Sequence, residues 1–414
     1  DQIMNIANRS VVNITLEENS EALDEVVVVG YGVQKKASLT SAISQIKGED
    51  VFKDRGIGNP TVALQGEVPG LSITRTSTRP GNEGAEMKIR GDISVNGKSS
   101  PLILIDGMAG SLDELNSMDA NDIENISVLK DASAAIYGAR SASGVVLVTT
   151  KRGKQGKAQI SYNASFSRTI NGIQPPITTN KEWLDMFYEA QYNDAAANNP
   201  KLTDPKEIHQ NINWWIFNSF GGTTIDGNPT TYVGESLFNA LREGKSLTLQ
   251  RGSNIDRWEP DNYMMDYLYG QASSQKHSVS IAGADDKFGY RISLSYSDNN
   301  SQLKVAEDGE KKYGARLNMD YQATSQLKIE SNISYEKRDI INPSTDVGAG
   351  YFDPWFWAVY NEKGDAYDTF SGNRNPIGGL TQGGRNKTGF ITFRGGMKAT
   401  YDLSKYLQGL SVSG

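Results

Sequence analysis

Few side chains in this sequence are of the types that catalyse reactions or hold metal ions. The 414 residues contain no cysteine and two histidines, His209 and His277, which lie far apart and lack metal-ligand spacing. The segment from Gly91 to Ser99 is similar to a phosphate-binding loop, but five residues rather than four separate Gly91 from Gly97. No serine lies in a recognisable nucleophile motif. We therefore expect no enzymatic activity, no metal site and no cofactor.

Aromatic residues in a long connection are the best candidates for contact with a ligand. Tyr351, Trp355 and Trp357 lie within a few residues of one another. Rings of this kind stack on sugars or on peptide side chains, and loops often carry binding residues. The same rings could instead pack the loop or lie at a membrane interface. Substrate contact and loop packing both remain open for this cluster.

The segment from Glu25 to Val29 could bind a partner through its main chain. Its four consecutive valines favour an extended backbone, and Gly30 and Gly32 end the strand. A short accessible strand can add to the sheet edge of another protein by main-chain hydrogen bonds. The alternative is an ordinary edge strand of its own domain. We expect the segment to be unpaired within its own chain.

Composition excludes some classes of protein. The formal net charge is −7, which disfavours nucleic-acid binding. No window of about 18 apolar residues is present, so we expect no membrane-spanning helix. Residue 1 is aspartate, and we expect the chain to be either a mature form or a fragment.

Turn residues and apolar runs divide the chain into four parts. Residues 1–22 are expected to be the tail of a preceding domain and a linker, and residues 23–36 hold the valine strand. Residues 37–153 alternate short strands with glycine-rich turns and short helices, which predicts a small mixed α+β sheet. Residues 154–414 follow a different pattern, in which apolar and polar residues alternate.

This alternation predicts about seven antiparallel strands. They are expected near residues 159–167, 278–281, 290–297, 315–322, 327–336, 391–401 and from 410 onward. A helix over Asn180–Asn193, capped by Asn180, is expected within the first long connection.

The connections between these strands alternate between long and short. The long ones include 170–274 and 339–388, and the short ones are tight turns. An up-and-down sheet would therefore have its short turns at one end and its long loops at the other, as in outer-membrane β-barrels. A soluble β-sandwich would explain the alternation but not the order of loop lengths. Seven strands cannot close a barrel around a domain of this size.

Three stretches carry a resemblance to a known family. They are LDEVVVVGYG at 23–32, MKIRGDISVNGKSSPLILIDG at 87–107 and DIENISVLKDASAAIYGARSASGVVLVTTKRG at 122–153. The first resembles a TonB box and the other two resemble plug-domain signatures. The chain from about residue 12 to 153 is thereby similar to the SusC/RagA-type TonB-linked outer-membrane transporters of Bacteroidetes.

The resemblance implies a plug domain inside a 22-stranded transmembrane barrel, of which this chain would hold the first seven or so strands. It implies energised import of a glycan or oligopeptide across the outer membrane. The implied partners are TonB with ExbB and ExbD, a SusD-like surface lipoprotein and outer-membrane lipid. A signal-transducing receptor of the same architecture and a soluble β-rich binding or adhesion protein are the alternatives.

The resemblance also assigns roles to residues. The TonB-binding strand would consist of Asp24, Glu25, Val26, Val27, Val28 and Val29. Arg90, beside Gly91, would form an ion pair that seats the plug on the barrel, although a role within the plug alone is equally open. Polar strand faces would line a wet lumen against the plug, with Arg291, Arg316, Asp320, Lys328, Glu330 and Arg394 among their residues.

Overall fold

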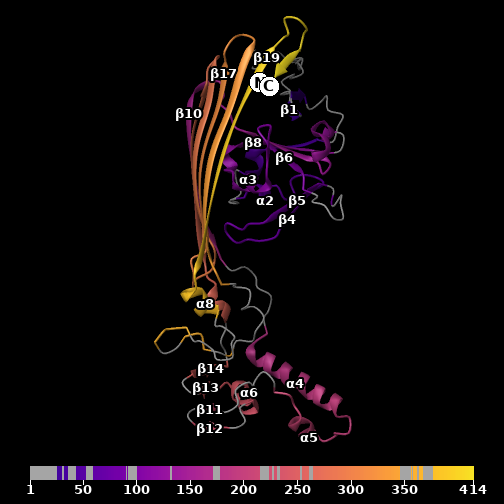
Figure 1. Cartoon of the computed structure of the whole chain (residues 1–414), viewed down its shortest axis with the longest axis vertical. Helices are drawn as coiled ribbons and strands as arrows, with labels where there is room; N and C mark the ends of the chain where they lie inside the picture. The colour runs from indigo at the N-terminus through magenta and orange to yellow at the C-terminus, as the bar shows by residue number, and fades with distance from the viewer. Residues whose placement is uncertain are drawn as a thin grey trace, which may run out of the picture.

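The computed structural model places two β-rich bodies side by side and a group of long connections beyond one end of them (Figure 1). It describes residues 26–29, 32–35, 43–52, 59–89, 91, 100–130, 133–170, 178–214, 223–225, 228–230, 234–251, 254–260, 264–345, 356, 358–360, 363–366 and 376–414.

The first body, here called the plug, runs from Ile43 to Gly153 and is built on a five-stranded mixed sheet. Its strand order is β3-β8-β9-β6-β7, with β6 and β9 parallel and the other pairs antiparallel. These strands are β3 (Ile43–Lys47), β6 (Leu102–Ile105), β7 (Met108–Gly110), β8 (Ile123–Leu129) and β9 (Val145–Thr150). The sheet confirms the small mixed sheet expected from the sequence.

Short helices and a separate ribbon complete the plug. The ribbon pairs β4 (Leu71–Arg75) with β5 (Ala85–Ile89). The helical segments are α1 (Gly48–Phe52), α2 (Pro60–Ala63), α3 (Leu112–Ser117), η2 (Ala120–Asp122) and η4 (Ala135–Ser141). Asn59 caps α2, whose first residue is proline. Apolar residues of the ribbon, of α3 and of the sheet form one buried cluster, and Leu104, Leu129, Ala134, Val145 and Leu147 form a second.

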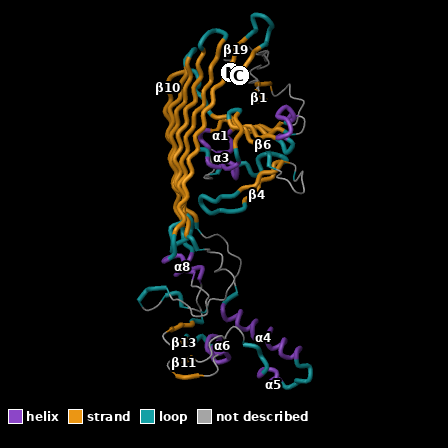
Figure 2. Tube along the Cα trace, viewed as in Figure 1, coloured by secondary structure: helices purple, strands orange, loops and turns teal. Residues whose placement is uncertain are grey.

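The second body, here called the wall, is a seven-stranded antiparallel sheet in which strands adjacent in sequence are adjacent in space. Figure 2 shows its long strands running alongside the plug. The strands are β10 (Gly156–Thr169), β15 (Ala272–Ala284), β16 (Phe288–Asn300), β17 (Gly309–Gln322), β18 (Leu327–Pro343), β19 (Arg385–Asp402) and β20 (Ser411–Ser413). The tight turns 285–287 and 323–326 lie at one end and the long connections 170–271 and 344–384 at the other, as expected, whereas the connections 301–308 and 403–410 are equal in length.

The two faces of the wall have opposite chemistry. Polar residues turned toward the plug are buried, such as Ser293 at 3% and Asn318 at 1% exposed. Apolar residues on the other face are open, such as Leu294 at 53% and Met397 at 75% exposed. A soluble β-sandwich would bury the apolar face instead, so that alternative is wrong. The arrangement is a plug against a partial β-barrel.

The long connections have their own secondary structure. They contain α4 (Asn180–Asn198), α5 (Pro205–Gln210), α6 (Gly234–Arg242), α7 (Met264–Leu268) and α8 (Pro376–Gln382). A four-stranded sheet joins β11 (Thr223–Ile225), β12 (Asn228–Thr230), β13 (Leu247–Arg251) and β14 (Asn254–Trp258). None of the helices in the described ranges is both long enough and apolar enough to cross a membrane.

The predicted helix near residue 180 exists, but its cap is Thr179 rather than Asn180. The Thr179 hydroxyl accepts from the backbone N–H of Glu182, and the Glu182 carboxylate accepts from the backbone N–H of Thr179. This reciprocal capping box satisfies two N–H groups, which a cap one residue later would not do.

Candidate functional site at the plug–wall interface

The valine strand is extended, as predicted, but it is not unpaired. β1 (Val26–Val29) forms a two-stranded antiparallel hairpin with β2 (Gly32–Lys35), in which Val29 is opposite Gly32. Two residues connect the strands, which is the shortest common hairpin connection. Asp24 and Glu25 lie outside the described residues. The expectation of an unpaired strand is therefore wrong, because its own continuation folds back on it. Among the residues that the structure describes, the hairpin joins neither the plug sheet nor the wall sheet.

The other predicted site residues are only partly placed. Arg90 lies outside the described residues, so its proposed ion pair stays a prediction. Gly91 is exposed and has a φ of +93°. Tyr351, Trp355 and Trp357 also lie outside the described residues. Their neighbour Phe356 is buried at 1% exposed and packs with Trp183 and Trp258 in the core of the long connections.

Three carboxylates of the plug meet three cations of the wall. Nη2 of Arg291 donates to Oδ1 of Asp122 at 3.0 Å, and Lys276 Nζ lies 2.9 Å from Oδ1 of Asp119. Further along the wall, Arg394 Nη2 lies 3.0 Å from Oε2 of Glu114. The capping box of α3 holds Glu114 in place, because its carboxylate also accepts from the backbone N–H of Ser111.

A turn of the plug is tied to the wall through a shared hydroxyl. Asp106, at the turn between β6 and β7, accepts from the Thr150 backbone N–H at 2.9 Å and from the Thr150 hydroxyl at 2.7 Å. That hydroxyl accepts from Nδ2 of Asn318, which also donates to the Lys151 carbonyl, both at 2.8 Å. Arg316 lies between two plug carboxylates, 3.8 Å from Asp106 and 3.6 Å from Asp122.

In two further contacts the signs of charge are exchanged, because a cation of the plug binds a carboxylate of the wall. Arg152, just after β9, donates from Nη1 to Asp320 and from Nη2 to Asn332, both at 2.8 Å. Arg79, in the loop between β4 and β5, donates from Nε to Asp308 at 2.9 Å. Charges of both signs therefore cross the interface in matched pairs, which favours one docking position over others.

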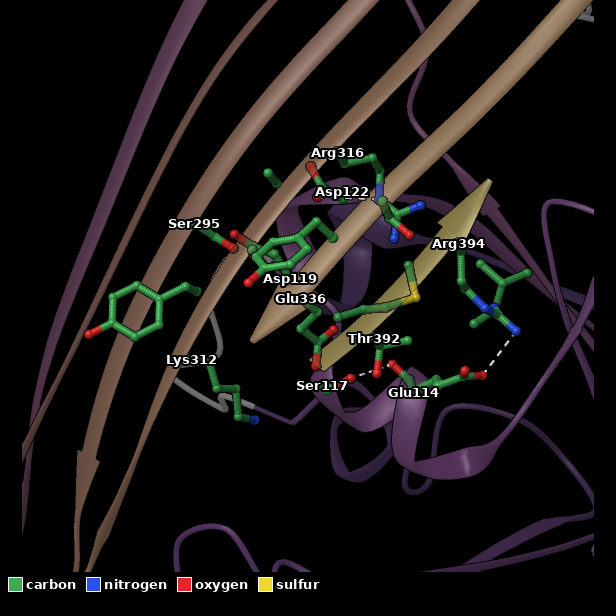
Figure 3. Close-up of a pocket in the computed structure, with 17 residues that line it drawn as sticks. Glu114, Ser117, Asp119, Asp122, Ser295, Lys312, Arg316, Glu336, Thr392 and Arg394 are labelled. Carbon is green, nitrogen blue, oxygen red and sulfur yellow. Dashed lines mark hydrogen bonds and ion pairs between the residues drawn. The ribbon is translucent and has the colours of Figure 1, made fainter. Parts of the chain in front are cut away.

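A small polar cavity of about 50 Å³, open to solvent, lies between α3 and strands β16 to β19. Figure 3 shows Glu114 directed at Arg394 on one side of the cavity. Asp119, Asp122 and Arg316 lie close together on the other side of the cavity. Its charged lining residues are Glu114, Asp119, Asp122, Lys312, Arg316, Glu336 and Arg394. Nε of Arg316 and Nη1 of Arg394 are buried without a hydrogen-bond partner. Part of the interface is therefore polar and loosely filled, unlike an apolar core.

Burial would by itself raise the pKa of Asp119, but its surroundings lower that pKa below the ordinary value. The charge of Lys276, and hydrogen bonds from Lys276, from the backbone N–H of Asn121 and from Ser278, favour the ionised carboxylate. Asp119 is thus an anion at neutral pH and holds β15 electrostatically.

The chemistry of the interface suits the docking of the plug on the wall rather than catalysis. No group of His, Cys, Asp and Glu side chains able to hold a metal ion occurs among the residues with described positions. The contacts are ion pairs and hydrogen bonds whose groups water could solvate after separation. Such contacts position two bodies precisely without the cost of exposing a large apolar surface.

The sequence predicted one side of this interface. The prediction that Arg291, Arg316, Asp320, Lys328, Glu330 and Arg394 line the plug side of the wall is confirmed by their partners there. Their plug partners Asp106, Glu114, Asp122 and Arg152 were missed. The pair of Asp119 with Lys276 was missed on both sides. The available signals were the Asp106-Gly107 turn and the capping pattern from Ser111 to Glu114.

Comparison with known proteins agrees with this geometry. The family model described as TonB-dependent Receptor Plug Domain matches residues 35–145. A TonB-dependent receptor of Formosa agariphila is 30% identical over 411 residues, which cover 97% of this chain and 36% of that protein. The TonB-dependent receptor SusC of Bacteroides thetaiotaomicron is 32% identical over 307 residues, which cover 71% of this chain and 24% of that protein.

A solved structure of the RagAB peptide transporter has a similar fold. Its TM-score is 0.65 at 23% identity, and the match covers 91% of this chain and 40% of that chain. The chain thus spans about a third or less of the length of the two curated relatives above.

Proposed function

Because this chain belongs to the TonB-dependent receptors of the SusC/RagA type, we propose that it provides the plug and the first barrel strands of an outer-membrane importer. TonB-dependent receptors are outer-membrane proteins. The proposed cargo is a glycan or an oligopeptide, and the RagAB structure, described as a peptide transporter, supports the oligopeptide.

The observation that carries the proposal is the inverted chemistry of the wall. Its apolar side chains face outward, where lipid would cover them, and its polar side chains face a plug held by ion pairs. A plug held by polar contacts can shift when it is pulled, because each separated charge regains water. The domain limits proposed are 1–22 for the preceding tail, 23–36 for the TonB-binding segment, 37–153 for the plug and 154–414 for barrel strands. The external loops expected at 170–274 and 339–388 are narrowed by the bounds of β15, β18 and β19 to 170–271 and 344–384.

The proposed partners supply the energy for transport and capture the cargo. TonB, energised by ExbB and ExbD, would add a strand to Asp24–Val29, and its pull would act on β3, the next strand of the plug. A SusD-like lipoprotein would close the end of the barrel that carries the long connections. Tyr351, Trp355 and Trp357 remain candidates for cargo contact, and Arg90 with Gly91 for seating.

Deletion of residues 24–29 from the full-length protein tests the function. We expect uptake to be lost while membrane insertion and cargo binding are kept, since β1 (Val26–Val29), the described part of the segment, belongs to neither the plug sheet nor the wall sheet. As a matched control, replacing Val26–Val29 by threonines preserves an extended main chain and should preserve uptake. Uptake that survives the deletion would refute the assignment.

A further inference from the structure

The loop between β4 and β5, residues 76–84, makes a wall contact of its own. Nε of Arg79 donates to Oδ1 of Asp308 at 2.9 Å, just before β17 begins. Beside it, Gly81 lies against Ile340, since a Cβ at Gly81 would be 2.6 Å from Cγ2 of Ile340. Figure 1 shows that the β4–β5 ribbon is on the side of the plug toward the long connections. This is the side from which cargo would arrive.

Arg79 uses only part of its hydrogen-bonding capacity. Its Nη2 is buried and has no hydrogen-bond partner, and its side chain is 35% exposed. Arg152 differs, because its Nη1 and Nη2 donate to Asp320 and Asn332. A guanidinium group binds a carboxylate best through two parallel N–H bonds. Arg79 thus holds Asp308 by one donor, below what its geometry permits.

The wall does not depend on Arg79 to satisfy Asp308. Nδ2 of Asn342 donates to the same Oδ1 atom at 2.8 Å. When Arg79 leaves, Asp308 keeps a donor, although its side chain is only 5% exposed. The contact can therefore be exchanged with less penalty than one in which a buried carboxylate loses its sole donor.

We propose that Arg79 binds a carboxylate group of the cargo and exchanges its single hydrogen bond to Asp308 for a bidentate pair with that group. The exchange frees loop 76–84 from the wall. This inference rests on the proposed import function and narrows its cargo to carboxylate-bearing molecules. Two sources have that chemistry, an oligopeptide and a glycan with acidic sugars.

Binding to the full-length protein with its surface partner tests the proposal. The probes are trialanine against its C-terminal amide, and trigalacturonate against maltotriose. We expect a preference for the free acid in at least one pair, and the responding pair identifies the source. Arg79→Gln should lower the affinity for that acid by about tenfold or more and leave the affinity for the neutral probe unchanged. Arg152→Gln, the matched control, should not alter the preference.

Two further variants separate recognition from misfolding. Arg79→Lys keeps the charge but not the planar fork, so its loss should be intermediate. Asp308→Asn removes the competing carboxylate and should tighten acid binding, which a misfolded protein would not do. Equal binding of acids and neutral probes by the unmodified protein, with uptake still dependent on residues 24–29, would overturn the carboxylate proposal and leave import standing. Uptake that is independent of residues 24–29 would instead overturn import driven by TonB through this segment.

Discussion

Asp122 of the plug and Arg291 of the wall are joined by a hydrogen-bonded ion pair of 3.0 Å, and both side chains are about 10% exposed. Arg291 also donates to Ser280 of the neighbouring strand, so the pair is held in place from the wall side. Asp122 has Arg316 as a second cation at 3.6 Å. One plug carboxylate therefore compensates two wall guanidinium groups.

Asp122→Asn should loosen the plug strongly. The variant keeps the shape of the side chain but leaves Arg291 and Arg316 without their shared counter-charge, and breaking a buried pair on one side costs about 3–5 kcal/mol. Protease cleavage of the plug in intact outer membranes, followed against urea concentration, measures the effect. Asp113→Asn, at an exposed position of α3, should leave the curve unchanged. Equal curves for the two variants would show that Asp122 does not seat the plug.

Seating should weaken in acid because of Asp119. Its folded-state pKa lies below the ordinary value of 3.8, so its contribution is complete above that value and is lost as pH falls through the lowered pKa. Plug protection from protease should therefore decline only below about pH 4. In Lys276→Met the buried carboxylate loses its cation, and the decline should move to higher pH. An unshifted profile in that variant would contradict the assigned role of Lys276.

Gly153 should not tolerate a side chain. A Cβ there would lie 2.3 Å from the Gly283 carbonyl oxygen and 2.7 Å from that of Tyr290, and backbone atoms of paired strands cannot move aside. Gly153→Ala should cost about 1–3 kcal/mol of stability where the plug joins the wall. Gly395→Ala is the control, because its nearest neighbour is a ring atom of Phe393 at 3.8 Å. Thermal unfolding of both variants compares them, and equal midpoints would refute the crowding argument.

The hairpin of β1 and β2 predicts which main-chain groups a partner strand would use. The register places Val29 opposite Gly32. In a hairpin with a two-residue connection the flanking pair is of the hydrogen-bonded kind, so we expect the N–H of Val27 to point to β2 and that of Val28 to point away. Val28→Pro should abolish TonB binding, whereas Val27→Pro should weaken only the hairpin. The affinities of the two variants for the periplasmic domain of TonB test this expectation. The reverse result would mean that the partner replaces β2.

Alternation of residue type was sufficient to predict the wall, because side chains on a strand point to opposite faces with a period of two. Its strands were nevertheless predicted too short, since β18 extends to Pro343 and β19 begins at Arg385. Those extra residues do not alternate, because Ile340 and Ile341 are adjacent and Arg385 to Thr388 are all polar. Hydrogen bonding to neighbouring strands keeps them extended.

Fold class and the polarity of the wall were determined by the sequence alone, because loop lengths and residue alternation are local properties. The partners at the interface were decided by the tertiary structure. Asp122 and Arg291 are separated by 169 residues, and either charge could have faced water in another docking position. Complementarity between two finished surfaces selects one position, and that selection depends on distances between parts of the chain that no local pattern encodes. The contact of Arg79 with Asp308, which leaves Nη2 of Arg79 without a hydrogen-bond partner, likewise depends on the position in which the plug docks.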